Sequence, residues 1–331
     1  NMRRVGILTC GADSPGQNAA IRAVARKAFD NNYEVIGINS GFNGLLNNNA
    51  FVMDKSTVSG ILQVGGTILG TSIGNPFLDE KNIKTAKDNF CKLSLTSLVI
   101  IGGFSYMKIA ETLYKNDIPI IGIPATIDND IPHTDRTIGF DSAIEFVASS
   151  LDRLHATASA HHRVFLVEVM GGGTGWIGIL GGLSGGADLI LVPEKSYTVP
   201  EILNHIDNRQ SSGKDFSIIV ISEEIKPPPD LIKKYNLNDL TDVLHYELSE
   251  CCRHEVRKLS LGHLQRGGSP TAFDRILATL MGVKAVELIH DGKTGKMVSY
   301  KNGKIGSVDL SEIKERKLVE PELIKIASLF Y

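Results

Sequence analysis

The sequence predicts an α/β fold built on doubly wound parallel sheets, and two observations lead to that prediction. Short apolar runs recur along the chain between amphipathic stretches of helical length. Continuous apolar runs are typical of parallel strands that are covered on both faces, whereas strands with one wet face alternate. Strands that alternate with helices form right-handed βαβ units, so we expect a parallel sheet with helices on both faces.

The expected strands are the continuous apolar runs, at residues 5–8, 34–38, 97–101, 118–123, 164–169, 189–192 and 217–221. The expected helices lie between them, where apolar residues recur with helical spacing. They cover residues 18–30, 83–91, 106–114, 143–160, 200–210 and 273–290. The proline-rich run at 226–230 is expected to be a surface connection.

Composition narrows the class of protein. At ~150 residues per domain, 331 residues allow about two domains, and a 42% hydrophobic content supplies an ample core. The net charge of −2 gives no global field for nucleic acid or an anionic membrane. The four cysteines form no CxxC pair, and no apolar run nears the ~18 residues that span a bilayer. We expect a cytoplasmic protein without nucleic-acid or membrane partners.

Ligands of open parallel sheets bind beyond the carboxyl ends of the strands, and several predicted strands are followed by glycines or polar residues. The turn at 11–18 opens a helix and offers free N–H groups to an anion, although an ordinary βα turn explains it as well. Gly102 and Gly103 follow another strand and admit a phosphate, or else form a tight turn capped by Ser105.

The strongest chemical signal follows the strand at 118–123. Thr126, Asp128 and Asp130 place a hydroxyl and two carboxylates at the end of one strand. One carboxylate can act as a general base while the other positions it or holds Mg²⁺. Clusters of Arg, His and Gly at 161–163, 170–175 and 262–270 suit a phosphate group, because arginine grips it bidentately and glycine admits it.

Together these motifs resemble those of the 6-phosphofructokinase family. Residues 8–22 are similar to the family's N-terminal region, and 124–130 resembles its catalytic PxTIDND motif. Residues 167–171 and 262–270 are similar to its sugar-phosphate motifs. The matches run collinearly from residue 3 to about residue 290. The resemblance implies two doubly wound parallel-sheet (Rossmann-like) domains with the phosphofructokinase fold: 1–140 plus about 266–315 for the donor nucleotide, and 141–265 plus about 316–331 for the sugar phosphate.

The resemblance also implies a role for each residue. Asp128 is the expected general base for the 1-hydroxyl of fructose 6-phosphate, and Thr126 and Asp130 support the transferring phosphoryl group, with Asp130 as the expected Mg²⁺ ligand. The expected sugar-phosphate residues are Arg163, Met170, Gly171, Glu223, Arg257, His263 and Arg266. In the family the equivalents of Arg163 and Arg257 come from a neighbouring subunit, which implies a homotetramer or at least a homodimer.

The departures from the family pattern lie almost entirely on the donor side. The expected donor-binding residues are Gly11, Gly102, Gly103 and Ser105. The family's GGDGS loop, whose Asp helps to hold Mg²⁺, is one residue shorter here, with Phe104 and no acid. The family's donor-phosphate arginine falls at Ile73, the second glycine of the first loop is Ala12, and Gly172 replaces another arginine.

These losses leave four alternatives open. The first is an ATP-dependent 6-phosphofructokinase, with Mg²⁺ held mainly by the nucleotide and the TIDND carboxylates. The second is a catalytically weakened sugar-phosphate-binding subunit that regulates an active paralogue, because each lost phosphate contact commonly costs ~10²–10³ in rate. The third uses pyrophosphate, although Ala125 is small as in ATP users. The fourth has another ketose phosphate as acceptor. Arg22, Arg26, Lys55 and Lys214 partly match the effector site of bacterial relatives.

Overall fold

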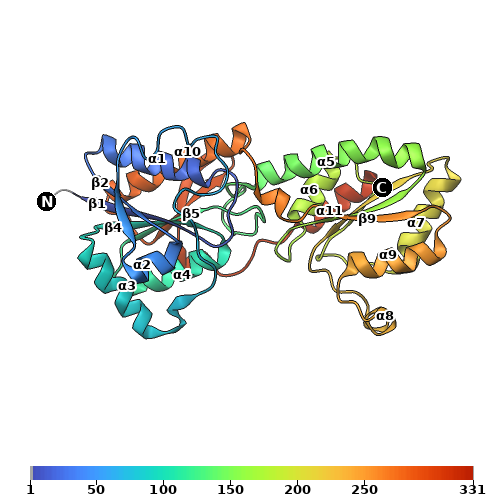
Figure 1. Ribbon diagram of the computed structural model, residues 1–331, viewed down its shortest axis with the longest axis horizontal. Coiled ribbons are helices and arrows are strands. Elements are labelled where there is room, and N and C mark those ends of the chain that lie inside the picture. Colours follow the sequence, from blue (N-terminus) through green and yellow to red (C-terminus); the bar gives the residue numbers. More distant parts are fainter. Residues whose placement is uncertain (1–2, 331) are drawn as a thin grey trace. The chain divides into compact units, whose positions relative to one another are not determined.

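The computed structural model describes residues 3–330, and the chain divides into two compact units (Figure 1). Unit 1 comprises the chain up to Ser142 together with Arg266–Lys317. Unit 2 comprises Ala143–Gln265 and the chain from Leu318 onward. Each unit has its own sheet, and the central strands of each sheet are parallel. The predicted α/β class with parallel sheets is therefore confirmed, whereas the donor and sugar-phosphate roles of the two parts stay predictions.

Unit 1 contains a seven-stranded sheet in the order β11-β10-β5-β4-β1-β2-β3. Its strands are β1 (Arg4–Cys10), β2 (Glu34–Ile38), β3 (Ala50–Met53), β4 (Ser97–Gly102), β5 (Ile120–Pro124), β10 (Lys296–Lys301) and β11 (Lys304–Asp309). The strands from β10 to β2 are mutually parallel, and only the edge strands β3 and β11 pair antiparallel. The ends of β1, β4 and β5 consequently meet at one edge of the sheet.

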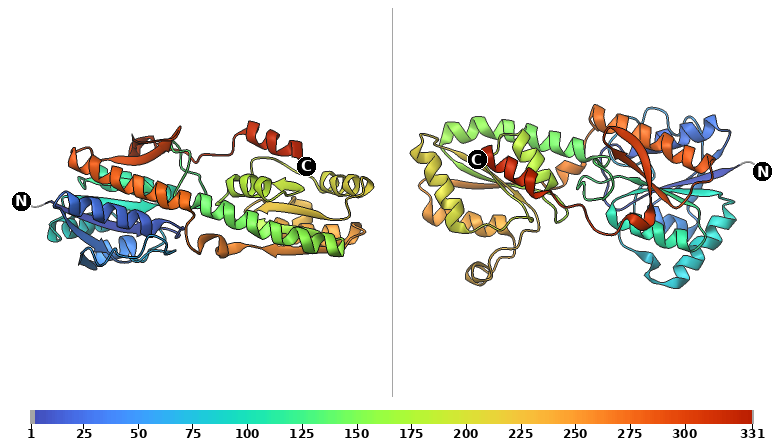
Figure 2. Two further views of the ribbon diagram at one scale, coloured as in Figure 1. Left: turned by 90° about the horizontal axis from the view of Figure 1, so that it is seen from above. Right: turned by 180° about the vertical axis from the view of Figure 1, so that it is seen from behind.

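Helices cover both faces of this sheet, as parallel strands require. On one face lie α1 (Gln17–Asp30) and α10 (Ala272–His290), which run side by side, blue and orange in Figure 2. Their approach is close, since a Cβ on Gly282 would meet the Cβ of Ala23 at 2.6 Å. On the other face lie α2 (Gly41–Asn47), α3 (Glu80–Lys92) and α4 (Phe104–Lys115) (Figure 1). Each face buries its own apolar cluster.

Unit 2 contains a four-stranded parallel sheet in the order β7-β8-β6-β9. The strands are β6 (Val164–Val169), β7 (Leu189–Leu191), β8 (Ser217–Ser222) and β9 (Val256–Ser260). The helices are α5 (Phe140–His161), α6 (Trp176–Ser184), α7 (Val199–Ser211), α8 (Pro229–Tyr235), α9 (Leu240–Cys251) and α11 (Pro321–Ala327). Ile202 and Ile206 of α7 pack with Leu244 and Leu248 of α9 over one face of the sheet.

Two local predictions need correction. The proline-rich run is not simply a surface connection: Pro227 is buried, and Pro229 begins α8. Ser105 does not cap α4, because the helix begins one residue earlier and Gly103 is its N-cap residue, with no side-chain cap. Within residues 3–330 no helix has the length and apolar character that crossing a membrane needs.

Candidate active site

A small polar cavity of about 120 Å³ lies in unit 1, where three neighbouring strands end. Ala12 lies after β1, the start of α4 follows β4, and Thr126 follows β5. The lining residues are Ala12, Gly103, Phe104, Ser105, Tyr106, Thr126, Asp128, Asp130, Arg266 and Arg316. The fold thus brings together the three catalytic residues, part of the donor loop and one sugar-phosphate arginine that the sequence predicted.

Hydrogen bonds fix the loop after β5 with Thr126, Asp128 and Asp130 at the cavity. The hydroxyl of Thr126 accepts a bond from the Asp128 N–H at 3.2 Å, and the Thr126 carbonyl accepts one from the Thr137 hydroxyl at 2.7 Å. Asn129 has a left-handed φ of 52°, and its amide bonds the Thr137 N–H and the Asp135 carbonyl. Asn129 therefore shapes the loop, while Asp128 is half-buried at the cavity wall.

Asp130 has a partner that sequence reasoning missed. Its Oδ2 lies 3.4 Å from Nε of Arg316, and its side chain is only 4% exposed. Burial raises the pKa of Asp130, and the opposing charges of Arg316 and Lys317 limit that rise. Arg316 lies in a charged run near the end of the chain, which resembles an ordinary solvated surface. No local signal in the sequence points to it.

The donor loop is built around tight glycine contacts. Gly11 has a φ of 84°, and a Cβ there would meet the Tyr106 ring at 2.3 Å, so only glycine fits. A Cβ on Gly102 would meet the carbonyl oxygen of Cys10 at 2.7 Å. Of the four predicted donor residues, Gly103 and Ser105 line the cavity, whereas Gly11 and Gly102 do not. Ile73 is 84% exposed.

The aromatic residue in place of the family's acid, Phe104, lies near two cations. Phe104 is half-buried against the core beneath α4. Nζ of Lys108 lies 4.9 Å from its ring centroid, and the guanidinium carbon of Arg316 lies 5.8 Å away. Such contacts contribute ~0.5–1 kcal/mol each at exposed positions. Phe104 thus anchors positive charge at a position where the family has a carboxylate.

Protein oxygens for a metal ion are few. Among residues 3–330 no group of three or more His, Cys, Asp or Glu side chains is arranged to hold one. Asp128 and Asp130 are the carboxylates at the cavity, and Asp130 already pairs with Arg316. A Mg²⁺ ion that arrives bound to the phosphoryl donor keeps phosphate and water ligands and needs only one or two protein carboxylates. Such an ion fits these two carboxylates better than a metal ion held by the protein alone.

In unit 2, several predicted sugar-phosphate residues form one network at the ends of β6 and β8. The N–H groups of Gly171 and Gly172 each donate to Oε1 of Glu223 at 3.1 Å. The Met170 N–H donates to Oε1 of Gln265 at 3.2 Å, and the sequence motifs had predicted no role for Gln265. Gln265 is buried. It lies inside the 262–270 motif, so its position beside His263 and Arg266 was the signal that could have found it.

The remaining two arginines lie elsewhere in unit 2. Nε of Arg163 bonds Oε2 of Glu255 at 2.6 Å, and Arg257 pairs with the other oxygen of the same carboxylate. These two charges hold the pKa of Glu255 below its usual value, with the hydrogen bond from Arg163 as the main cause. Arg163 directly precedes β6, whereas Met170 directly follows it. His263 is exposed on the short 3₁₀ segment Gly262–Arg266.

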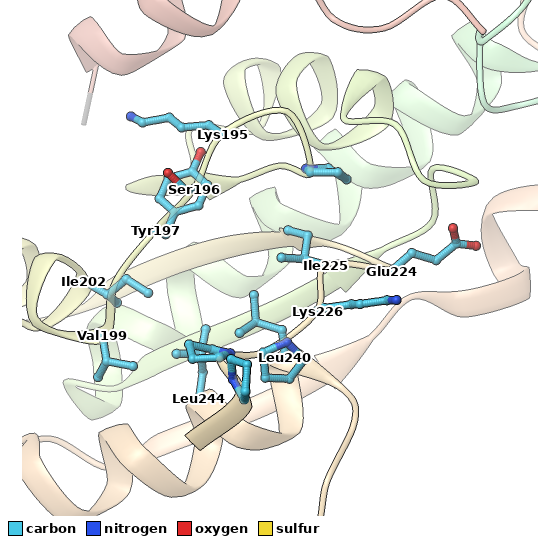
Figure 3. A pocket seen from close by; sticks show the side chains of 14 residues that line it. Lys195, Ser196, Tyr197, Val199, Ile202, Glu224, Ile225, Lys226, Leu240 and Leu244 are labelled. Atoms are coloured by element: carbon cyan, nitrogen blue, oxygen red, sulfur yellow. The ribbon is translucent and has the colours of Figure 1, made fainter. Parts of the chain in front are cut away.

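A larger pocket in unit 2, of about 420 Å³, has a different character (Figure 3). Val199 and Ile202 of α7 and Leu240 and Leu244 of α9 surround it, and the proline-rich run completes the wall. None of the predicted sugar-phosphate residues lines it. Its mostly apolar walls do not suit a phosphorylated sugar. The candidate active site is therefore the smaller polar cavity of unit 1, which contains Thr126, Asp128 and Asp130.

The chain is similar in sequence to known proteins over almost its whole length. The phosphofructokinase family model matches residues 4–289. The pyrophosphate–fructose 6-phosphate 1-phosphotransferase of Dictyoglomus thermophilum is 39% identical over 340 aligned positions, covering 99% of this chain and 98% of that protein. The ATP-dependent 6-phosphofructokinase 3 of Streptomyces coelicolor is 41% identical over 330 positions, covering 96% and 97% respectively.

A solved structure gives the same result for the fold. The phosphofructokinase of Pichia pastoris in the T-state superposes with a TM-score of 0.83 at 31% identity, over 95% of this chain. The present chain spans 38% of the length of that yeast chain. The bacterial relatives, by contrast, are covered almost end to end. The matched motifs, the two parallel sheets and these similarities together show that the chain belongs to the phosphofructokinase family.

Proposed function

We propose that this chain is a 6-phosphofructokinase that transfers a phosphoryl group from ATP to the 1-hydroxyl of fructose 6-phosphate, the glycolytic reaction that forms fructose 1,6-bisphosphate. The observation that carries the proposal is the unit 1 cavity, in which Asp128 and Thr126 face the start of α4 and Arg266. The Streptomyces relative is named an ATP-dependent enzyme, and Ala125 supports the same donor.

Each residue at the cavity has a part in the proposed reaction. Asp128 takes the proton from the sugar hydroxyl as that oxygen attacks the terminal phosphorus. Thr126 and Asp130 hold the transferring group, and the amides of Gly103 and Ser105 at the start of α4 suit its negative charge. Phosphoryl transfer needs positioning and charge neutralisation more than covalent chemistry. When bound to the donor, Mg²⁺ supplies part of that neutralisation, with Asp130 as its proposed protein ligand.

Unit 2 is the proposed sugar-phosphate part and unit 1 the donor part. Met170, Gly171, Glu223 and His263 belong to the proposed sugar-phosphate set of one copy. Arg163 lies at the other end of β6 from Met170, so a second copy of the chain is the natural source of Arg163 and Arg257. This placement supports a homodimer or homotetramer. The free state of all four cysteines supports a reducing compartment, and we propose the cytoplasm.

A coupled assay of the purified protein tests the proposal. Fructose 6-phosphate and Mg²⁺ are supplied with ATP in one series and with pyrophosphate in the other. We expect turnover with ATP. Turnover with pyrophosphate alone would favour the second donor, which the name of the Dictyoglomus relative makes a specific alternative. Turnover with neither, together with calorimetric binding of fructose 6-phosphate, would favour a non-catalytic sugar-phosphate-binding subunit, as the altered loop at Phe104 suggests.

A further inference from the structure

The chain lacks two arginines that the family pattern provides, one in each unit. Ile73 of unit 1 stands where a donor-phosphate arginine is expected, and Gly172 of unit 2 stands where an arginine is expected after Met170 and Gly171. Gly172 has a φ of 56°, a conformation that arginine adopts rarely. A donor with two or more phosphates carries several negative charges, so the chain needs a positive group at the cavity from another source.

The cavity contains that group. Arg316 lines it beside Thr126 and Ser105, and 43% of the arginine side chain is exposed. Arg266 also lines the cavity, but its proposed role is to bind the sugar phosphate. The cavity also contains the carboxylates of Asp128 and Asp130. Of its two arginines, Arg316 is the one that has no proposed role in binding fructose 6-phosphate.

The backbone next to Arg316 is tied to the catalytic loop. The N–H of Lys317 donates to the Asp130 carbonyl at 2.7 Å. Nζ of Lys317 donates to the carbonyls of Thr134 at 2.7 Å and Asp135 at 3.2 Å. The Phe104 ring and the Asp130 carboxylate then fix the guanidinium itself, at 5.8 Å and 3.4 Å. Arg316 is therefore preorganised at the start of α4, where the helix dipole also favours an anion.

We propose that Arg316 binds the phosphates of the phosphoryl donor and replaces the donor-phosphate arginine that is missing at Ile73. The inference rests on the proposed function, because it concerns the donor of that same reaction. Where the family has a loop carboxylate, this chain has the Phe104 ring, and that ring supports the guanidinium of Arg316. A guanidinium can bind phosphate oxygens through two parallel hydrogen bonds without a metal ion. Donor binding should accordingly persist in part when Mg²⁺ is removed.

The test measures binding directly, on the full chain, by calorimetry with pyrophosphate and with a non-hydrolysable ATP analogue, each with Mg²⁺ and with chelator. Fructose 6-phosphate is titrated in parallel. The variants are Arg316→Ala, Arg316→Gln, which keeps a hydrogen-bond donor for Asp130 without the charge, and Arg316→Lys. Lys314→Ala is the matched control, since it removes the same charge from an exposed position two residues away.

We expect the Ala and Gln variants to weaken donor-probe binding about 10- to 100-fold and to leave fructose 6-phosphate binding unchanged. Arg316→Lys should recover part of the loss, and Lys314→Ala should bind like the parent. The proposal is overturned if the parent binds neither probe, if both Arg316 variants keep parental donor affinity, if they lose sugar affinity equally, or if Lys314→Ala has the same effect. A parent that binds donor probes through Arg316 without turnover contradicts the proposed function and leaves this inference standing.

Discussion

Arg163 and Met170 stand at opposite ends of the same strand, β6, one just before Val164 and the other just after Val169. At ~3.3 Å per residue, six residues separate the two ends by about 20 Å. A sugar phosphate held by Met170 and Gly171 is therefore out of reach of Arg163 in the same copy. Glu255 bonds both Arg163 and Arg257, so the two arginines lie together and could reach the site of another copy as a pair.

This separation predicts complementation between two inactive variants. Asp128→Asn lacks the proposed base, and Arg163→Ala lacks the proposed borrowed cation, so each homo-oligomer should be almost inactive. In co-expressed oligomers, random pairing gives about a quarter of the sites an intact base from one copy and an intact Arg163 from the other. Turnover of the mixed oligomers is the measurement. If they stay as inactive as the parents, the arginine is not supplied by a second copy.

Asp128→Asn should remove turnover without removing sugar binding. A general base contributes ~10²–10⁴ in rate, and the amide cannot accept the hydroxyl proton. We expect a fall of that size in kcat by coupled assay, with fructose 6-phosphate affinity by calorimetry close to the parent. Asp135→Asn, an exposed residue further along the same loop, serves as the control. Parental turnover in the Asp128 variant would show that another group takes the proton.

Gln17 and Asn18 are neighbours with opposite expected effects on stability. Gln17 is fully buried, and within residues 3–330 neither atom of its amide group has a hydrogen-bond partner. Asn18 bonds the carbonyls of Val64 and Gly65 and the N–H of Ile68. Because an unsatisfied buried amide costs about 1–3 kcal/mol, Gln17→Met should raise the unfolding free energy by an amount in that range.

Asn18→Ala is the matched comparison and should lower the unfolding free energy by about the same amount, because it orphans three backbone groups. Urea unfolding followed by circular dichroism measures both changes. A loss of stability in Gln17→Met would mean that the amide has a partner, such as a buried water, that the methionine displaces.

Asp274 should make stability depend on pH. Its carboxylate is fully buried and accepts bonds from the N–H and hydroxyl of Ser142 and the N–H of Gly139. Burial raises its pKa to about 6 from 3.8 despite these bonds. Between pH 4 and 6 the folded state therefore holds a proton that the unfolded state has lost, so this residue's contribution to stability declines as pH rises through that window.

The measurement is the unfolding free energy of the parent and of Asp274→Asn at pH values from 4 to 7.5. The parent should lose about 2 kcal/mol of stability relative to the variant as pH rises from 4 to 6, and the difference should level off by about pH 7. Other buried carboxylates titrate in both proteins and cancel in the comparison. Parallel curves over the whole range would show that Asp274 titrates normally.

The sequence predicted the parallel strands well because each is a continuous apolar run buried on both faces, as in β6 and β8. The predictions failed where strands are exposed or antiparallel. Only Val256 of β9 is buried, so its apolar signal is weak. The β10–β11 hairpin had a sequence signal that could have been used, the dipeptide Asn302-Gly303, which is typical of two-residue hairpin turns. In the structure both residues have positive φ and form the turn between the two strands.

The candidate site divides in a similar way. Thr126, Asp128 and Asp130 were predictable because they follow a buried strand, and the fold of parallel sheets fixes where strand ends meet. Arg316 was not, because its place at the cavity depends on Lys317 bonding a loop far away in sequence. No periodicity or motif spacing encodes a contact of that kind.

The division of unit 1 into two chain segments has a consequence for how the protein is made. The ribosome releases α1 long before α10, so the face of α1 around Ala23 and Val24 has no partner until residue 290 has emerged. The main segment of unit 2 is synthesised in the interval. Domains usually fold in order from the N-terminus during synthesis, and exposed apolar faces invite aggregation. Unit 1 therefore cannot be completed until the main segment of unit 2 has been synthesised, and the apolar face of α1 stays exposed on the nascent chain during that interval.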